Sequence, residues 1–145
     1  MNAQEVIHKI QEVAKANQKR DEAHKTREVR GLKAGECYRQ GDLYVFKVAD
    51  SHPVGSELKR HQLADGISIG QRHCLVGDFK VYEGKKAPTG IADLQARAGL
   101  GYAFDVLTPG AINTHPEHDN FRLMECGRYQ VMHQVDLRTL QRVDD

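Results

Sequence analysis

The sequence lacks any apolar run close to the roughly 18 residues that a helix needs to span a bilayer. Its N-terminus, MNAQEVIHKIQEV, carries charges where a secretory signal peptide needs an uninterrupted apolar segment. Cysteine is also scarce. Cys37, Cys74 and Cys126 are odd in number, widely spaced and without a CxxC motif, which favours reduced thiols over a disulfide framework or a zinc knuckle. These absences predict a cytoplasmic protein with no membrane partner.

Motifs of several enzyme classes are missing as well. The sequence contains no P-loop, no GxSxG nucleophile elbow and no recognisable Cys-His-Asn grouping, and the glycines of AGLGYAF do not fit a dinucleotide fingerprint. The net charge is only +1, so no global field attracts nucleic acid. Lys85 and Lys86 are interpreted as solubilising charges in a turn, with nucleic-acid contact as the less favoured alternative.

Residues 1–30 contain neither proline nor glycine. Val6, Ile10 and Val13 recur at i, i+4 and i+7, the stripe of an amphipathic helix, which we expect to run to about residue 18. The polar residues that follow either continue this helix in solvent or form a linker. The apolar stripe packs on the rest of the chain or, alternatively, mediates assembly into a homo-oligomer.

Residues 31–145 have the texture of a β-rich domain large enough for one core. β-branched and aromatic residues alternate with polar ones between Gly and Pro turn signals. Besides the strand-like stretch GECYRQGDLYVFKVADSHPVGS (35–56), strands are expected at about 60–64, 67–69, 73–76, 79–83, 102–107, 111–114, 120–124 and 128–137. Residues 91–98 are expected to form a short helix or a lid-like loop. The fold class predicted is mainly β, an antiparallel sandwich or small barrel with an N-terminal amphipathic helix.

Three stretches carry a family resemblance: RQGDLYVFKV (39–48), HQLADGISIGQRHCLVGD (61–78) and the C-terminal segment from THPEHDNF (114–121) onwards. Together they resemble a family of small, largely uncharacterised bacterial and phage-borne β-rich proteins, with QGDV, TGHxH-like and HxEH…GxYxVxxQ motifs. The resemblance implies a β-rich fold and points to His73, His115 and His118. Where the family has TGHxH, this chain has Gln71 in place of one histidine. The resemblance implies no known activity.

The segment His115, Pro116, Glu117 and His118 is the candidate site. Proline cannot donate to a strand ladder, but its fixed φ suits the second position of a β-turn. A turn brings its first and last Cα atoms within about 7 Å, so the two imidazoles can converge on one metal ion or one phosphate. The alternative interpretation is a solvated polar turn without chemistry.

Two mechanisms fit these residues. In the first, His73, His115 and His118 bind a divalent transition metal and Glu117 acts as base towards a metal-bound water. In the second, His115 and His118 act as general acid and base without a metal, and Gln71, Arg72 and His73 bind an anionic substrate. His133, on the inward face of the final strand, is interpreted as a satisfied core histidine.

Three functions remain open from the sequence. The favoured one is a small binding module that holds an anionic or nucleotide-like ligand, or a protein partner, through its histidine-containing loops. The alternative is a metal- or histidine-dependent hydrolase or lyase acting on a phosphate-containing substrate. The third is a structural subunit of a phage or particle. The binding module is favoured because Gln71 interrupts the histidine pair.

Overall fold

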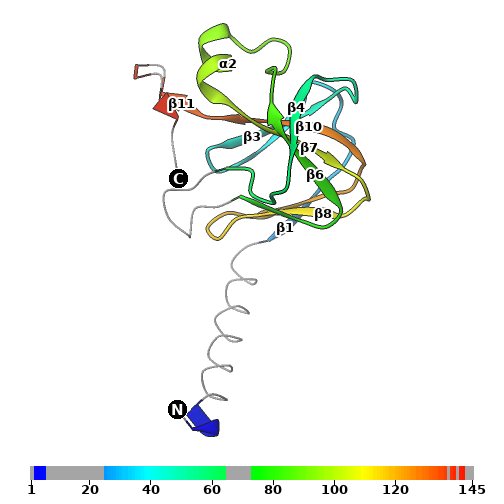
Figure 1. Ribbon diagram of the computed structural model, residues 1–145, viewed down its shortest axis with the longest axis vertical. Coiled ribbons are helices and arrows are strands. Elements are labelled where there is room, and N and C mark those ends of the chain that lie inside the picture. The colour runs from blue at the N-terminus through cyan, green and yellow to red at the C-terminus, as the bar shows by residue number, and fades with distance from the viewer. Residues whose placement is uncertain (1, 6–24, 65–72, 137, 140, 143–145) are drawn as a thin grey trace.

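A computed structural model describes residues 2–5, 25–64, 73–136, 138–139 and 141–142. Within these residues the chain is mainly β, as predicted, and its strands form a six-stranded, a four-stranded and a two-stranded sheet. Figure 1 shows the two larger sheets forming one body, with the β11–β12 hairpin at its edge.

The six-stranded sheet is antiparallel throughout and has the order β2-β3-β10-β7-β6-β4. Its strands are β2 (Cys37–Gln40), β3 (Leu43–Val48), β10 (Gly127–His133), β7 (Leu100–Val106), β6 (Phe79–Gly84) and β4 (Val54–Leu58). The register between β7 and β10 shifts between Gln130 and Met132, which marks a bulge or irregularity. The strand β10 is shorter than the expected strand at 128–137. It ends at His133, and β11 (Val135–Asp136) then pairs with β12 (Gln141–Arg142).

The four-stranded sheet has the order β1-β9-β8-β5. Its strands are β1 (Thr26–Val29), β9 (Asn120–Leu123), β8 (Ala111–Thr114) and β5 (Cys74–Val76). β1 was not predicted, because its residues were assigned to the polar linker, and it pairs in parallel with β9. Backbone bonds explain how an exposed polar segment becomes a strand: Asn120 N donates to Lys25 O and Met124 N donates to Val29 O.

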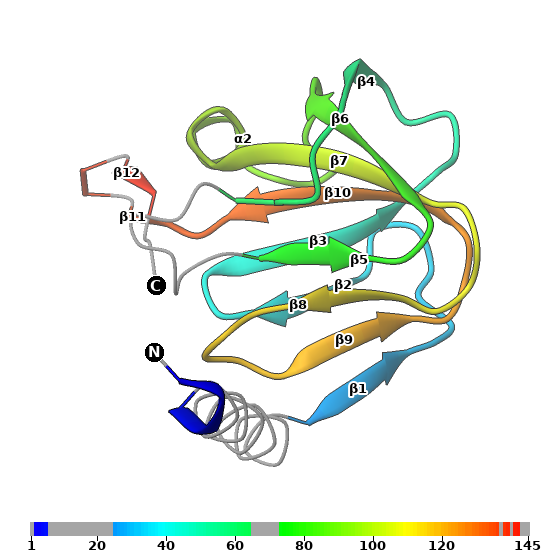
Figure 2. The same ribbon diagram turned by 60° about the horizontal axis from the view of Figure 1, so that its bottom comes forward.

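The two larger sheets pack face to face, as Figure 2 shows, and the hydrophobic core lies between them. The core includes Val45, Phe104 and Val131 from the six-stranded sheet and Leu75 and Leu123 from the four-stranded sheet. Neither sheet closes on itself in the part of the chain that the structure describes, so the alternative of a small barrel is wrong. Burial of both inner faces satisfies the alternating pattern without closure.

Other expectations have mixed outcomes. Residues 91–98 contain a short helix, α2 (Asp93–Gly99). Residues 3–5 are helical, but the rest of the N-terminal helix and the strand at 67–69 lie outside the described residues. Residues 60–64 form a single bridge, Gln62 to Cys74, instead of a strand. No helix within the described residues is long and apolar enough to cross a membrane.

Candidate functional site

The interior between the sheets contains a polar group as well as the hydrophobic core. Among the described residues, seven polar or charged ones are buried, and each is at most 5% exposed: Gln40, Asp42, His73, Asn113, His115, His133 and, on the other face of β10, Gln130. Buried polar groups are costly unless they form hydrogen bonds, so their arrangement locates the part of the molecule where a function other than packing can be sought.

A tight turn places Gln40 and Asp42 in this interior. Gln40 pairs with Leu43 at the end of the β2–β3 hairpin, which leaves Gly41 and Asp42 as a two-residue loop. Gly41 has a φ of 60°, the left-handed conformation that such hairpin loops require and that glycine adopts without strain. The sharp reversal directs the Gln40 and Asp42 side chains towards the same histidine.

That histidine is His73, which immediately precedes β5. Gln40 Nε2 donates to Asn113 O at 3.1 Å and to Asp119 O at 2.9 Å, and these two acceptors fix the orientation of the Gln40 amide. Gln40 Oε1 therefore faces His73 Nδ1 at 2.6 Å and accepts a hydrogen bond from its N–H. On the other side of the ring, Nε2 lies 3.4 Å from Asp42 Oδ1. Both ring nitrogens of His73 thus face side-chain oxygens that can accept a hydrogen bond.

The carboxylate of Asp42 is influenced by two histidines. Burial by itself would raise the pKa of Asp42, but the hydrogen bond and charge of His73 outweigh it, and His133 adds a smaller effect in the same direction. The net result is a pKa below the ordinary value. Asp42 is therefore an ionised carboxylate in the interior, paired with His73 and near the charge of His133.

The loop between β8 and β9 continues the histidine group towards the surface. The ring centroids of His73 and His115 are 4.4 Å apart, and those of His115 and His118 are also 4.4 Å apart. The backbone N–H of Glu117 donates to His115 Nδ1 at 3.0 Å, so a neutral His115 carries its proton on Nε2. His115 is buried, whereas His118 is half-buried. The three rings form a row from the interior to the surface.

This hydrogen bonding bears on the predicted metal site. His73 Nδ1 is engaged by Gln40 Oε1 and its Nε2 faces Asp42 Oδ1, and the lone pair of His115 Nδ1 already accepts a bond from Glu117 N–H. A histidine ligand must offer a nitrogen lone pair to the metal. Among the described residues, no group of three or more His, Cys, Asp or Glu side chains is arranged to hold a metal ion. Metal binding by these histidines would require their present bonds to break.

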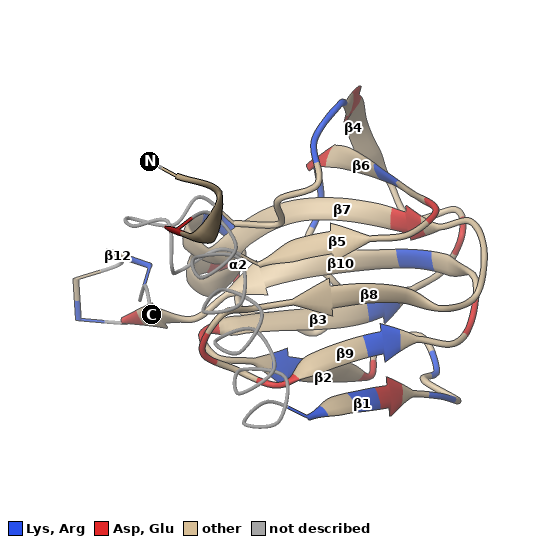
Figure 3. Cartoon of the chain, turned by 90° about the horizontal axis from the view of Figure 1, so that it is seen from below, with Lys and Arg blue, Asp and Glu red and all other residues tan. Residues whose placement is uncertain are grey.

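A pocket of about 410 Å³ opens beside the end of the histidine row. It is lined by Arg27, Arg39, Gln40, Gly41, His118, Asp119 and Phe121. These residues come from β1, β2, β9 and the loops next to them, and Figure 3 shows that these three strands lie on one side of the molecule and carry basic residues. We call this cavity the arginine pocket.

The two arginines differ in how they are held. Arg27 Nε forms an ion pair with Asp119 Oδ2 at 2.7 Å, which offsets its charge. Arg39 Nε donates to Gly41 O at 2.6 Å and Nη2 to Gln134 Oε1 at 2.9 Å. These bonds fix the Arg39 guanidinium through neutral acceptors, so its positive charge is not cancelled by them.

The structure brings together some of the predicted residues. His73, His115 and His118 are neighbours. Glu117 contacts His115 through its backbone N–H, and Glu117 is an exposed residue. Gln71 and Arg72 lie outside the described residues. His133 is buried, as expected for a core histidine, and influences Asp42.

Sequence reasoning missed four residues: Gln40, Asp42, Arg27 and Arg39. A signal existed for the first two, because two polar residues flank a glycine between otherwise strand-like segments in RQGDLYVF. Arg27 and Arg39 gave no such signal, since arginine is common on solvated strands.

Comparison with known proteins adds a family but no activity. No curated protein and no solved structure gives a significant match to the chain. Residues 39–134 match a family described as "Domain of unknown function (DUF8820)", and the match includes Gln40, Asp42 and all three histidines of the row. Because the match spans more than half of the chain, this protein belongs to that family.

Proposed function

We propose that this protein is a small binding module that holds an anionic, nucleotide-like ligand in the arginine pocket. The observation that supports this most is the convergence of Arg39 and His118, from different parts of the chain, on one cavity of about 410 Å³. This volume lies within the range of pockets that hold small molecules and cofactors, roughly 300–1,000 Å³. Arg39 supplies a planar guanidinium with N–H groups beyond those that bind Gly41 and Gln134, which suits a phosphate or carboxylate.

Phe121 gives the pocket an aromatic wall. Its ring stacks on Tyr38 with centroids 4.6 Å apart, and the same residue lines the pocket. An aromatic side chain beside a cationic group suits a ligand with a planar ring and a negative charge. Any nucleobase can stack on an aromatic face, whichever base it is. This pairing favours a nucleotide over inorganic phosphate.

The test is a calorimetric titration of the full chain with adenosine monophosphate and, separately, with inorganic phosphate. We expect the nucleotide to bind, and Arg39→Gln to weaken its binding about tenfold or more, because a charge-assisted contact is lost. Arg122→Gln is the matched control: Arg122 lies on β9 next to Phe121, so alternation places it on the opposite face of the sheet. Failure of both ligands to bind, or equal binding by the Arg39 and Arg122 variants, would contradict the proposal.

The second candidate is a histidine-dependent hydrolase or lyase of phosphate-containing substrates. It is favoured by the row of His73, His115 and His118, whose surface end lines the same pocket as Arg39. An imidazole at the pocket wall could exchange a proton with a bound phosphoester, with Asp42 behind His73 stabilising positive charge. Turnover of a chromogenic phosphodiester that is lost in His118→Ala, while circular dichroism shows an intact fold, would support catalysis.

The version of this enzyme that uses a metal is tested by elemental analysis of the purified protein. His73, His115 and His118 are its proposed ligands, and Glu117 its proposed base. Roughly one zinc, iron or manganese per chain, lost in the His115→Ala/His118→Ala double variant, would establish it. The bonds that His73 and His115 already form favour the metal-free site.

Assembly through the N-terminal helix is also a proposal. Light scattering on the full chain and on a chain without residues 1–18 would test it, and a change in mass per particle to that of a monomer is the expected result. The cytoplasmic location and the partner-protein alternative stay predictions of the sequence.

A further inference from the structure

A second cavity, of about 190 Å³, lies next to His133, the histidine whose charge lowers the pKa of Asp42. It is lined by Glu83 and Gly84 of β6, by Leu100, Gly101 and Tyr102 of β7, by His133 of β10 and by Arg142 of β12. We call it the His133 pocket. All of its lining residues are described, and it shares none of them with the arginine pocket.

Strand register explains why its side chains converge. Val81 on β6 pairs with Phe104 on β7, and both belong to the core. Glu83 lies two residues after Val81, and Tyr102 lies two residues before Phe104. Alternation along the two strands therefore places Glu83 and Tyr102 on the same inner face. On β10, Tyr129 and Val131 are core residues, and the same alternation carries His133 to the inner face.

Gly101 makes room for the imidazole. A Cβ atom at this position would lie 3.2 Å from His133 Cδ2 and 3.0 Å from Val131 Cγ1, closer than ordinary van der Waals contact. A larger residue here would therefore displace His133 from the wall of the pocket. The ring is only 4% exposed, so the pocket has a buried, polar end.

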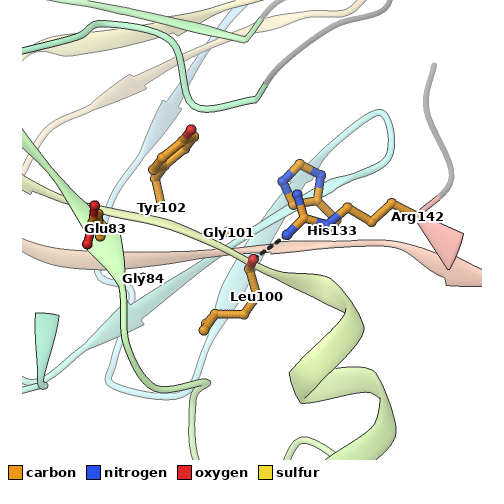
Figure 4. Close-up of a pocket in the computed structure, with 7 residues that line it drawn as sticks. All are labelled: Glu83, Gly84, Leu100, Gly101, Tyr102, His133 and Arg142. Carbon is orange, nitrogen blue, oxygen red and sulfur yellow. Dashed lines mark hydrogen bonds between the residues drawn. The ribbon is translucent and has the colours of Figure 1, made fainter. Parts of the chain in front are cut away.

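Charges of opposite sign lie at the two sides of the pocket. Figure 4 shows Glu83 on one side and Arg142 with His133 on the other, with Tyr102 and Leu100 between them. The Arg142 guanidinium is held in place, because its Nε donates to Ala98 O at 3.1 Å and its Nη2 to Leu100 O. These acceptors are neutral, so the positive charge of Arg142 is not cancelled by them.

Tyr102 is fixed as well. The guanidinium of Arg60 lies 4.2 Å from the centroid of the Tyr102 ring, and its Nη1 donates to the Tyr102 hydroxyl at 2.6 Å. The aromatic wall between the two charged sides is therefore rigid. A fixed cation, a fixed ring and a carboxylate around a small cavity form a preorganised site, which reduces the entropy lost when a ligand binds.

Volume and charge together define the ligand. About 190 Å³ is below the range of roughly 300–1,000 Å³ found for drug-sized ligands, so a nucleotide is too large. A small ligand that carries both a carboxylate and an ammonium group can direct the carboxylate to Arg142 and His133 and the ammonium group to Glu83. We propose that the His133 pocket binds a small zwitterion of the free α-amino acid class.

The experiment is an NMR titration of the full chain with alanine and serine, compared with propionate and ethylamine, which carry only one of the two charges. We expect the amino acids to bind at least about tenfold more tightly than either single-charge analogue, since each charge contributes a charge-assisted hydrogen bond. The amide signals that shift should include those of Gly84, Gly101 and Tyr102.

Two variants test the assignment of the charges. Glu83→Gln should reduce amino acid affinity about tenfold and leave propionate affinity unchanged, and Arg142→Gln should reduce the affinity for both. Lys80→Gln is the matched control, because Lys80 also lies on β6 but alternation places it on the outer face. Glu83 is exposed, so its variant is expected to fold, and circular dichroism checks this.

Two results would overturn the proposal. The first is no binding of either amino acid up to about 10 mM, a concentration well above the dissociation constants of weak specific sites. The second is amino acid binding of equal affinity in the Glu83, Arg142 and Lys80 variants. Because the two pockets share no residues, loss of nucleotide binding to the arginine pocket would leave this proposal standing, and the reverse also holds.

Discussion

Nδ1 of His73 lies 2.6 Å from Oε1 of Gln40, and this hydrogen bond joins the two larger sheets at their polar end. Gln40 ends β2 of the six-stranded sheet, and His73 precedes β5 of the four-stranded sheet. The Gln40 amide also donates to Asn113 O and Asp119 O, so one buried side chain connects β2 to β5, to β8 and to the loop before β9. Removing this side chain should therefore lower the stability of the fold.

Gln40→Ala should destabilise the protein by about 2–4 kcal/mol, since it leaves the buried Asn113 carbonyl, the part-buried Asp119 carbonyl and the His73 N–H without their bonds. Urea unfolding followed by circular dichroism measures the free energy of unfolding. Gln141→Ala, at an exposed position on β12, is the control and should unfold as the native protein does. A Gln40 variant as stable as this control would mean that the amide bonds contribute little.

The protonation of His73 can be observed directly. Because His73 Nδ1 faces the Gln40 Oε1 acceptor, NMR of the imidazole nitrogens should show a proton on Nδ1 of His73. A neutral His115 should show a proton on Nε2 and a bare Nδ1, which accepts from Glu117 N–H. A bare Nδ1 on His73 would contradict the hydrogen bond to Gln40 and would make that nitrogen available to a metal.

Asp42→Asn should change how stability depends on pH. The native pKa of Asp42 is below its ordinary value of 3.8, so the ionised group adds stability above that value, and this contribution is lost as the pH falls through the lowered native pKa. The difference in unfolding free energy between the native protein and the variant should therefore be largest near pH 5 and shrink towards about pH 2, a window below the usual titration of histidine.

Urea unfolding at several pH values in that window provides the measurement. Asp78→Asn is a suitable control: Asp78 is exposed and accepts a bond from Thr108 Oγ1. A pH-independent difference for Asp42→Asn would show that its native pKa is not lowered.

Arg128→Lys should cost about 1–2 kcal/mol of stability, because lysine cannot reproduce the paired guanidinium–carboxylate geometry. Arg128 Nε donates to Asp105 Oδ1 at 2.8 Å and Nη2 to Asp105 Oδ2 at 3.0 Å, and both side chains are less than 20% exposed. Its Nη1 also donates to His52 O at 2.8 Å. The melting temperature of Arg128→Lys, measured by thermal unfolding, is compared with that of the native protein.

Arg138→Lys is the matched control for this substitution. The Arg138 side chain is 89% exposed in its pair with Asp136, and solvent screens such pairs. We expect no measurable change in the melting temperature for Arg138→Lys. Equal effects of the two substitutions would show that the buried geometry around Arg128 carries no particular stability.

Sequence reasoning was most successful where side-chain alternation reports burial. The alternation of Tyr129 and Val131 with their neighbours correctly indicated an inward face for β10, although Gln130 and Met132 on its other face are buried as well. It failed for β1, whose residues are largely exposed and which forms through backbone bonds to β9. The β-propensity of a segment does not predict its pairing with a strand more than ninety residues away in the sequence.

The candidate site was partly visible in the sequence. The spacing of His115 and His118 in a proline-containing loop indicated two neighbouring imidazoles, and their rings are in contact. Arg39 and Arg27 could not be selected, because their approach to the same pocket depends on how β1 and β2 are placed in different sheets.

The sequence by itself determined the β-rich class and the local juxtaposition of His115 and His118, because both depend on residues a few positions apart. Only the tertiary structure decided what the histidines can do. The partners of His73 are Gln40 and Asp42, which precede it by 33 and 31 residues, and no local pattern encodes that contact. The availability of a nitrogen lone pair depends on which acceptor faces it, so the chemistry of the site is fixed by the packing of the two sheets.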